Sequence, residues 1–167
     1  MDANFRDFLK QQVPPSAYDY HYVEQKDIDV ASSYSKEHFP DMPLTHKYLS
    51  QILVKGHGVG VFLKDKTKGD IAASIFCELN SRNKRIYISE VIVSEAHREK
   101  GLGRNLIKLF ETFGVLNDYH RLCSNIAVTN INSMHLHQKM GFKKERLERT
   151  YFDDGSDAFY MVKMINS

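Results

Sequence analysis

The sequence is poor in the residues that would place it in a specialised protein class. Its two cysteines, Cys77 and Cys123, cannot form a disulfide framework or supply a four-cysteine zinc site. Nine glycines and four prolines among 167 residues exclude collagen-like and low-complexity chains. The formal net charge of +2 provides no strong field that would attract nucleic acid or an anionic membrane.

Long apolar segments are also missing. No run of 18 apolar residues is present, which argues against a membrane span. The polar residues 1–4 do not resemble the apolar part of a signal peptide, so we expect a cytoplasmic protein without nucleic-acid or membrane partners. The length fits one domain, and we expect an N-terminal lead segment at 1–17 followed by a single domain at 18–167.

The hydrophobic periodicity predicts a mixed α/β (α+β) fold. Alternating residues between 59 and 93 predict three strands in a meander, and a later helix has apolar residues at i, i+4, i+7, i+8 and i+11 from Leu102. We expect a mostly antiparallel, twisted sheet of six to seven strands flanked by about four helices. The expected strands lie at 18–24, 59–63, 71–79, 86–93, 121–128, 143–149 and 158–164, and the expected helices at 28–38, 43–56, 102–113 and 132–139.

One turn in this pattern has the chemistry of an anion site. The strand Val91-Ile92-Val93 is followed by Arg98-x-x-Gly101-x-Gly103, which opens a helix. Glycines allow a ligand to approach the backbone, and the free N–H groups of a helix start favour phosphate. No third glycine follows at the spacing that a dinucleotide fingerprint needs, and no Gly-Lys-Ser/Thr follows, so neither common nucleotide motif is present.

Two segments together resemble the signatures of the GNAT superfamily of N-acetyltransferases. The segment 90–107, which contains Arg98-x-x-Gly101-x-Gly103, resembles its acetyl-CoA motif. The segment 129–142 resembles its second signature, and the order of the expected elements also matches. The residues that carry this second resemblance are Asn130, Ser133, Leu136, His137, Lys139, Gly141 and Phe142.

This resemblance implies acetyl-CoA as cosubstrate and a set of binding residues. Backbone groups of Val91, Ile92 and Val93 would pair with the pantetheine arm, and Asn130 would contact the cofactor, with Lys139 near its adenosine end. The neighbouring parallel strands would splay apart to admit it. The residues implied around the pyrophosphate are Arg98, Glu99, Lys100, Gly101, Leu102, Gly103 and Arg104.

The implied reaction is direct acyl transfer from a thioester to a primary amine in a ternary complex. The amine must lose a proton before it attacks, and Glu90 is the candidate base. On an alternating strand Glu90 shares a face with Ile86, Ile88 and Ile92, where burial would raise its pKa. The alternative is a structural carboxylate bonded to a neighbouring amide. Backbone amides near Val91 would polarise the thioester carbonyl.

The departing thiolate benefits from a proton, for which His137 and Tyr151 are candidates. Many members of the superfamily have a tyrosine at the position of His137. Histidine can also donate a proton, and near neutral pH it can accept one. The alternative for His137 is a half-buried packing residue. Tyr160 is a further candidate acid, and we expect both cysteines to pack in the core.

The acceptor stays open between a small-molecule amine, amino acid or polyamine and a protein N-terminal amine. The segment 151–161 resembles a hairpin of protein N-terminal acetyltransferases, although Asp-Gly turns and aromatic strands also make ordinary hairpins. The alternative function is a non-catalytic acyl-CoA-binding or interaction module of the same fold, supported by the absence of a tyrosine at His137. No metal site is expected from the spacing of the eight histidines, and a homodimer is left open.

Overall fold

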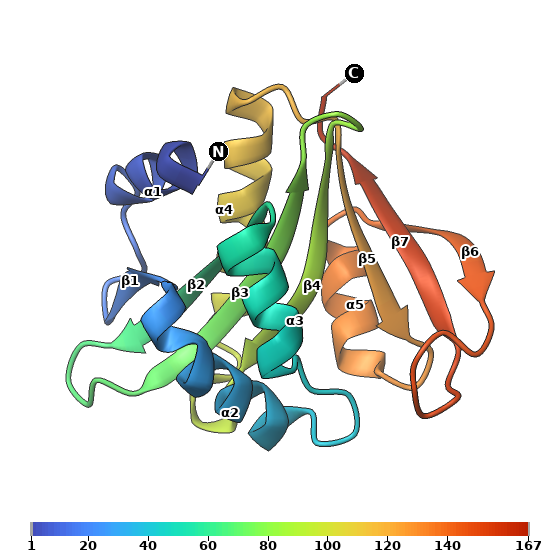
Figure 1. Cartoon of the computed structure of the whole chain (residues 1–167), viewed down its shortest axis with the longest axis horizontal. Helices are drawn as coiled ribbons and strands as arrows, with labels where there is room; N and C mark the ends of the chain where they lie inside the picture. Colours follow the sequence, from blue (N-terminus) through green and yellow to red (C-terminus); the bar gives the residue numbers. More distant parts are fainter. Residues whose placement is uncertain (1, 167) are drawn as a thin grey trace.

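The computed structural model describes residues 2–166, with side chains from Phe5 onward (Figure 1). Seven strands form one sheet in the order β1-β2-β3-β4-β5-β7-β6, antiparallel except for the pair β4–β5. This confirms the expected mixed, mostly antiparallel sheet. The elements are α1 (Asp2–Lys10), β1 (Tyr18–Tyr22), η1 (Gln25–Asp27), α2 (Ile28–His38), α3 (His46–Ser50), η2 (Gln51–Lys55), β2 (Gly58–Asp65), β3 (Ile71–Asn80), β4 (Arg85–Val93), η3 (Glu95–His97), α4 (Leu102–Leu116), β5 (Arg121–Ala127), α5 (Ile131–Lys139), β6 (Lys143–Glu148) and β7 (Ala158–Met164).

Helices cover both faces of the sheet. On one face α2, α3 and η2 pack against β2 and β3 through a small cluster that contains Ile28, Leu49, Phe62 and Phe76. On the other face α1, α4 and α5 share the larger core, to which α4 contributes its apolar stripe. The expected helix at 43–56 was wrong at its start: α3 begins at His46, and residues 39–45 form a loop instead.

The N-terminal helix α1 is part of this larger core. Phe5 is fully buried, and its ring stacks on Phe110 of α4 with the centroids 4.8 Å apart. Phe113 meets Phe5 edge-on at 4.9 Å and Phe8 at 5.3 Å. Residues 5–9 therefore pack on the same core as the rest of the chain.

The sheet opens between its two parallel strands. Residue pairing between β4 and β5 covers only Arg85–Ile88 and Arg121–Ser124, while β4 continues to Val93 and β5 to Ala127. Figure 1 shows the two strands diverging along their direction. The backbone edges of Ser89–Val93 and Asn125–Ala127 that would have continued this pair instead flank an opening in the sheet.

A β-bulge in β4 changes which side chains face which helices. Phe76 of β3 lies opposite Glu90, whereas the next residue, Cys77, lies opposite Ile88, so Ser89 is the inserted residue. Before the bulge Ile88 faces the larger core, and after it Val91 does. Glu90 therefore points to the α2 face of the sheet. The expectation that Glu90 shares a face with Ile86 and Ile88 was wrong, because strict alternation does not continue through a bulge.

None of the helices described between residues 2 and 166 has the length and apolar character needed to cross a bilayer.

Candidate active site

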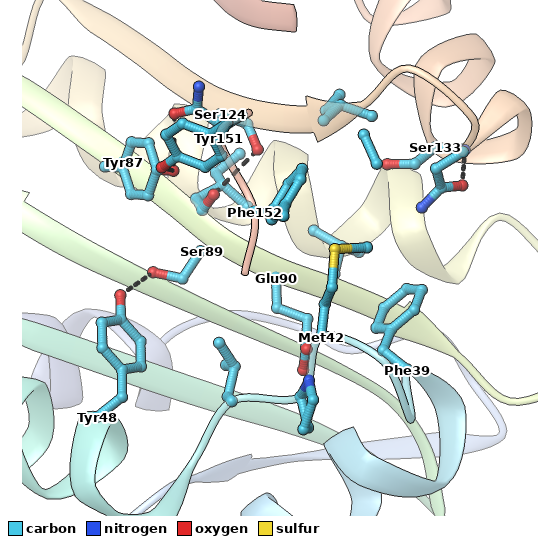
Figure 2. A pocket seen from close by; sticks show the side chains of 18 of the residues that line it. Phe39, Met42, Tyr48, Tyr87, Ser89, Glu90, Ser124, Ser133, Tyr151 and Phe152 are labelled. Carbon is cyan, nitrogen blue, oxygen red and sulfur yellow. Dashed lines mark hydrogen bonds between the residues drawn. The ribbon is translucent and has the colours of Figure 1, made fainter. Parts of the chain in front are cut away.

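A cavity of about 480 Å³ lies where β4 and β5 diverge. Its walls come from the loop 39–45, from α3, from the end of β3, the middle of β4 and the end of β5, from α5, and from the loop that joins β6 to β7. Figure 2 shows Glu90, Met42 and Phe152 in the centre of this region. The three expected catalytic residues all line this cavity: Glu90, His137 and Tyr151.

Glu90 combines burial with an unused acceptor atom. The residue is only 8% exposed, and its Oε2 accepts a hydrogen bond of 2.7 Å from the Ser35 hydroxyl. Oε1 has no hydrogen-bond partner among the described residues. Burial raises the pKa of this carboxyl to about 7, although the bond from Ser35 acts in the opposite direction. Glu90 can therefore exchange a proton near neutral pH.

Ser35, which is not among the residues predicted from the sequence, connects this carboxyl to the loop 39–45. Its Oγ also accepts a hydrogen bond of 2.7 Å from the backbone N–H of Leu44. One turn earlier on α2, the Ser32 hydroxyl donates to the Leu44 carbonyl at 3.2 Å. Two serines of α2 thus hold both backbone polar groups of one loop residue. A buried serine between Tyr34 and Lys36 carries no sequence signal that would have revealed this role.

His137 lies on α5 with one ring nitrogen committed to the helix. Nδ1 lies 2.8 Å from the Ser133 carbonyl, and because a carbonyl only accepts, Nδ1 carries the hydrogen of the neutral ring. Nε2 is then an acceptor, and it has no partner among the described residues. Burial, with the side chain only 2% exposed, lowers the pKa of the imidazole despite the bond to Ser133. The ring is therefore neutral at pH 7 and offers a lone pair to its surroundings.

Tyr151 belongs to a chain of hydroxyl bonds. The Tyr87 hydroxyl donates to Asn125 Oδ1 at 2.9 Å and lies 3.1 Å from the Tyr151 hydroxyl. Because the single Tyr87 hydrogen goes to Asn125, Tyr151 is the donor in the second bond. This arrangement anchors the β6–β7 loop to β4, while Tyr151 itself stays 42% exposed. The alternative acid, Tyr160, is buried in β7, where its hydroxyl accepts a long bond of 3.5 Å from Arg85.

A second group of polar side chains lies on the α3 side of the cavity. The Tyr48 hydroxyl donates to Glu78 Oε2 at 2.8 Å and lies 2.7 Å from the hydroxyl of Ser89, the bulge residue (Figure 2). Burial raises the pKa of Tyr48, so it remains a neutral donor to the Glu78 carboxylate. No local sequence pattern marks these residues, because their partners lie 30 or more positions away.

The cavity wall is negatively charged. Four carboxylates contribute to it, Asp41, Glu78, Glu90 and Asp153, whereas no lysine or arginine is among the described residues that line it. Apolar surface comes from Phe39, Met42 and Phe152. The wall therefore favours a ligand that is both cationic and partly apolar.

The expected phosphate site lies at the start of α4. Gly101 has φ +72°, and Glu99 before it has φ +63°, so the backbone turns sharply before the helix. Asn105 N–H bonds to Gly101 O at 2.9 Å, so the three earlier amides of the helix, at 102–104, precede its first regular bond. A side chain at Gly101 would meet open space rather than protein. The basic residues of this segment, Arg98, Lys100 and Arg104, are exposed.

The remaining expected cofactor residues are only partly brought together. Val91 and Val93 flank Gly103, where an added Cβ would lie 3.9 and 3.5 Å from them, so the expected strand lies beside the helix start. Ile92 instead is buried opposite Ser74 of β3. Asn130 lines the cavity and caps α5 by accepting from Ser133 N–H. Lys139 is exposed on α5.

A model described as the acetyltransferase (GNAT) family matches residues 22–142. The chain belongs to this family. The match includes Glu90, the whole segment 98–104 and His137, and it confirms the membership that the two sequence signatures predict.

Curated relatives of this GNAT chain match about half of it. N-alpha-acetyltransferase from Saccharolobus solfataricus is 27% identical over 88 residues, which is 52% of this chain and 52% of that protein. Streptothricin acetyltransferase from Streptomyces lavendulae is 27% identical over 97 residues, which is 56% of this chain and 51% of that protein. The aligned part of the chain spans about half the length of these relatives.

Solved structures confirm the GNAT fold over most of the chain. The ribosomal-protein-S18-alanine N-acetyltransferase from Escherichia coli has a TM-score of 0.76 at 18% identity, covering 90% of this chain and 95% of that one. Spermidine/spermine N-acetyltransferase SpeG from Vibrio cholerae has a TM-score of 0.70 at 16% identity, with 90% and 94% covered. At these identities the likeness concerns the fold alone.

Two further sets of reactive side chains lie outside this cavity, the two cysteines and a group of two aspartates and a histidine. Cys77 and Cys123 are buried free thiols, and burial raises the pKa of both. Asp65, Asp70 and His97 bring ligand-type atoms within 4.8 Å of one another. However, Asp65 accepts two backbone N–H bonds of its own turn, and Asp70 is exposed. We assign no metal site to this group.

Proposed function

We propose that the protein is an acetyl-CoA-dependent N-acetyltransferase that acts on a primary amine. The observation that carries the proposal is the buried Oε1 of Glu90, which has no partner among the described residues, lies in the cavity wall and belongs to a carboxyl with a pKa of about 7. Such an atom can accept a hydrogen bond from a protonated amine and can then accept the proton itself.

A second acceptor in the same wall supports an amine as the ligand. Nε2 of His137 also lacks a partner among the described residues. A primary ammonium group offers three N–H donors, whereas a thioester offers none. Because buried acceptors without partners cost free energy, a bound ammonium group would relieve both.

The segment at the start of α4 fits the diphosphate of acetyl-CoA. The amides 102–104 provide donors, Arg98, Lys100 and Arg104 provide positive charge, and Gly101 leaves the approach open. The unpaired edge of β4 from Ser89 onward provides backbone groups for the pantetheine arm. When bound, acetyl-CoA supplies the thioester whose acetyl group is transferred.

The two acceptors divide the proton transfers between them. Glu90 Oε1 accepts one proton from the bound ammonium group, which frees the nitrogen lone pair to form the C–N bond as the C–S bond breaks. His137 Nε2 accepts the second proton from nitrogen and passes it to the departing sulfur. The products are the N-acetylated amine and a free thiol, and Glu90 returns its proton to water. In this scheme His137 accepts before it donates, as its neutral ring requires.

The role of Tyr151 follows from its bond to Tyr87. To protonate the sulfur, Tyr151 would have to give up that bond. We propose that Tyr151 instead fixes the β6–β7 loop, which brings Phe152 and Asp153 to the cavity. The two backbone bonds from Tyr151 and Phe152 N–H to Ser156 O support a well-defined loop.

Two acceptor classes are compatible with the cavity. The acidic wall favours a small cationic amine, including a polyamine, which carries charge beyond the reacting nitrogen. The position of the β6–β7 loop over the cavity, and relatives named as N-alpha-acetyltransferases, favour a peptide N-terminus. An α-amino group has an ordinary pKa of about 7.7–8.0, against about 10.4 for a lysine amine, so a base with a pKa of about 7 is better matched to it.

The experiment is thiol release from acetyl-CoA with separate pools of monoamines, polyamines, amino acids and short peptides. Release above the acceptor-free rate supports the proposal, and the active pool identifies the acceptor class. Calorimetric binding of acetyl-CoA without release in any pool would favour the alternative, a non-catalytic acyl-CoA-binding module. Absence of both binding and release would refute the assignment.

A further inference from the structure

The hydroxyl of Ser35 occupies a position that the proposed reaction does not explain. Ser35 is fully buried in α2, and its oxygen takes part in two short hydrogen bonds of 2.7 Å. Serines within helices usually bond to the carbonyl of the preceding turn. Here the hydroxyl instead joins two segments that are far apart in the sequence, Leu44 of the loop 39–45 and Glu90 of β4.

The direction of both bonds is fixed by chemistry. The Leu44 N–H can only donate, so it occupies a lone pair of Ser35 Oγ. The ionised Glu90 carboxylate can only accept, so the single Ser35 hydrogen goes to its Oε2. This assignment leaves Oε1 as the one carboxylate oxygen free to meet a ligand.

The same loop residue is held from a second point. Ser32 donates to the Leu44 carbonyl, so displacement of the loop would break bonds to both serines. The loop also contributes Phe39, Asp41 and Met42 to the cavity wall. The loop 39–45, which forms part of the cavity wall, and Glu90, the proposed proton acceptor, are therefore both bonded to the Ser35 hydroxyl.

We infer that Ser35 is a positioning residue that couples the loop 39–45 to Glu90, so that Glu90 is oriented and stabilised as a carboxylate only while the loop is in place. This inference rests on the proposed role of Glu90 as proton acceptor. The loop that contacts the amine thereby also controls the protonation of Glu90, which removes the proton from the amine. Loss of the Leu44 bond would free the Ser35 hydroxyl to turn toward its own helix and leave Glu90 Oε2 without its donor.

Several other titratable groups lie near Glu90, and their influence on its pKa must be distinguished from that of the Ser35 hydroxyl. Removing the Ser35 hydroxyl changes none of their charges directly. These groups are Tyr34 on α2, Asp41 in the loop, Tyr48 on α3, Glu78 on β3, Tyr87 on β4, His137 on α5, and Tyr151 and Asp153 in the β6–β7 loop.

The test compares Ser35→Ala with two matched serine variants of the same helix. Ser32→Ala removes a loop anchor without touching Glu90, and Ser33→Ala changes an exposed serine. For Ser35→Ala we expect the acidic limb of the kcat/KM profile to move from about pH 7 toward about pH 8, a loss of about fivefold in kcat/KM at pH 7. Ser32→Ala loosens the loop but keeps the Ser35 hydroxyl, so it should raise KM for the amine and move this limb in the same direction by less than Ser35→Ala does, whereas Ser33→Ala should change neither.

A titration that needs no activity separates this inference from the proposed function. The Glu90 carboxyl, labelled with carbon-13, is followed by NMR in the intact free protein, with Glu90→Gln to assign the signal. A higher pKa in Ser35→Ala than in wild type supports the coupling even if no acceptor amine has been found. Ser35→Cys, which keeps a weak donor of similar size, should give a smaller shift and serves if the alanine variant does not fold. An unchanged Glu90 pKa in the folded Ser35 variants would overturn the inference.

Discussion

The burial of Glu90 predicts opposite effects of one substitution on activity and on stability. Glu90→Gln keeps the size of the side chain and the oxygen that accepts from Ser35, but it removes the charge. Loss of a general base lowers the rate by about 10²–10⁴-fold, so we expect kcat to fall within this range. The wild-type kcat/KM should fall about tenfold per pH unit below pH 7, because only the ionised carboxylate accepts a proton.

The stability effect follows from the raised pKa. The folded protein holds the Glu90 proton up to about pH 7, whereas the unfolded chain releases it near the ordinary value of 4.5. As the pH rises between these values the unfolded state is favoured, and by pH 8 the free energy of unfolding has fallen by about 3 kcal/mol. Glu90→Gln avoids this loss. We therefore expect the variant to be more stable than wild type at pH 8, by an amount that largely disappears at pH 5.

Thermal unfolding at pH 5 and pH 8 measures this difference. For a chain of this size about 3 kcal/mol corresponds to a gain of about 6–12 °C in Tm at pH 8. Glu37→Gln, which changes an exposed carboxylate on α2, is the control and should not show the pH-dependent gain. If wild type and Glu90→Gln lose stability in parallel between the two pH values, the burial argument fails. If the variant keeps most of its activity, Glu90 is not the base.

Three further substitutions test other parts of the site. Gly101→Glu should weaken acetyl-CoA binding at least about tenfold in calorimetry, because the new carboxylate repels the diphosphate. The control Gly69→Glu, at a glycine of the β2–β3 turn with a similar φ of +76° and equally open surroundings, should not weaken it. Equal losses in both variants would point to backbone strain alone. His137→Phe should lower kcat by about 10²-fold or more and leave the Kd of acetyl-CoA unchanged, and a changed Kd with normal turnover would contradict the proton relay. Glu78→Gln should raise KM for a diamine about fivefold but not for the monoamine of equal length, since only the diamine has a second charge; a uniform change would exclude a role in charge recognition.

The fold was largely predictable because its signals are local. The meander, the helix from Leu102 and the turn at Gly101 each depend on periodicity or on a glycine within one short segment. The divergence of β4 and β5 was expected only from the family resemblance, since no local pattern states where a pair of strands stops bonding. Pro43 suits a first helical turn and so predicts helix at 43–45, but Thr45 caps α3 and places its start at His46.

The sequence indicates candidate residues for the site but not their geometry. Glu90 and His137 could be selected from sequence, yet the face that Glu90 occupies depends on the bulge at Ser89. A bulge is set by the register of β3 against β4, which the sequence of β4 alone does not reveal. The role of Ser35 could not be predicted for a related reason, because only the tertiary fold brings its two partners, Leu44 and Glu90, next to it.

The packing of α1 on α4 has a consequence for the order of events during synthesis. Phe5 leaves the ribosome well before Phe110 and Phe113, the rings that cover it in the folded protein. At translation rates of about 5–20 residues per second, the apolar face of this helix stays without its partner for roughly 5–20 s. The nascent chain therefore exposes this face until α4 has been synthesised, and the larger core is completed only when β7 supplies Met161.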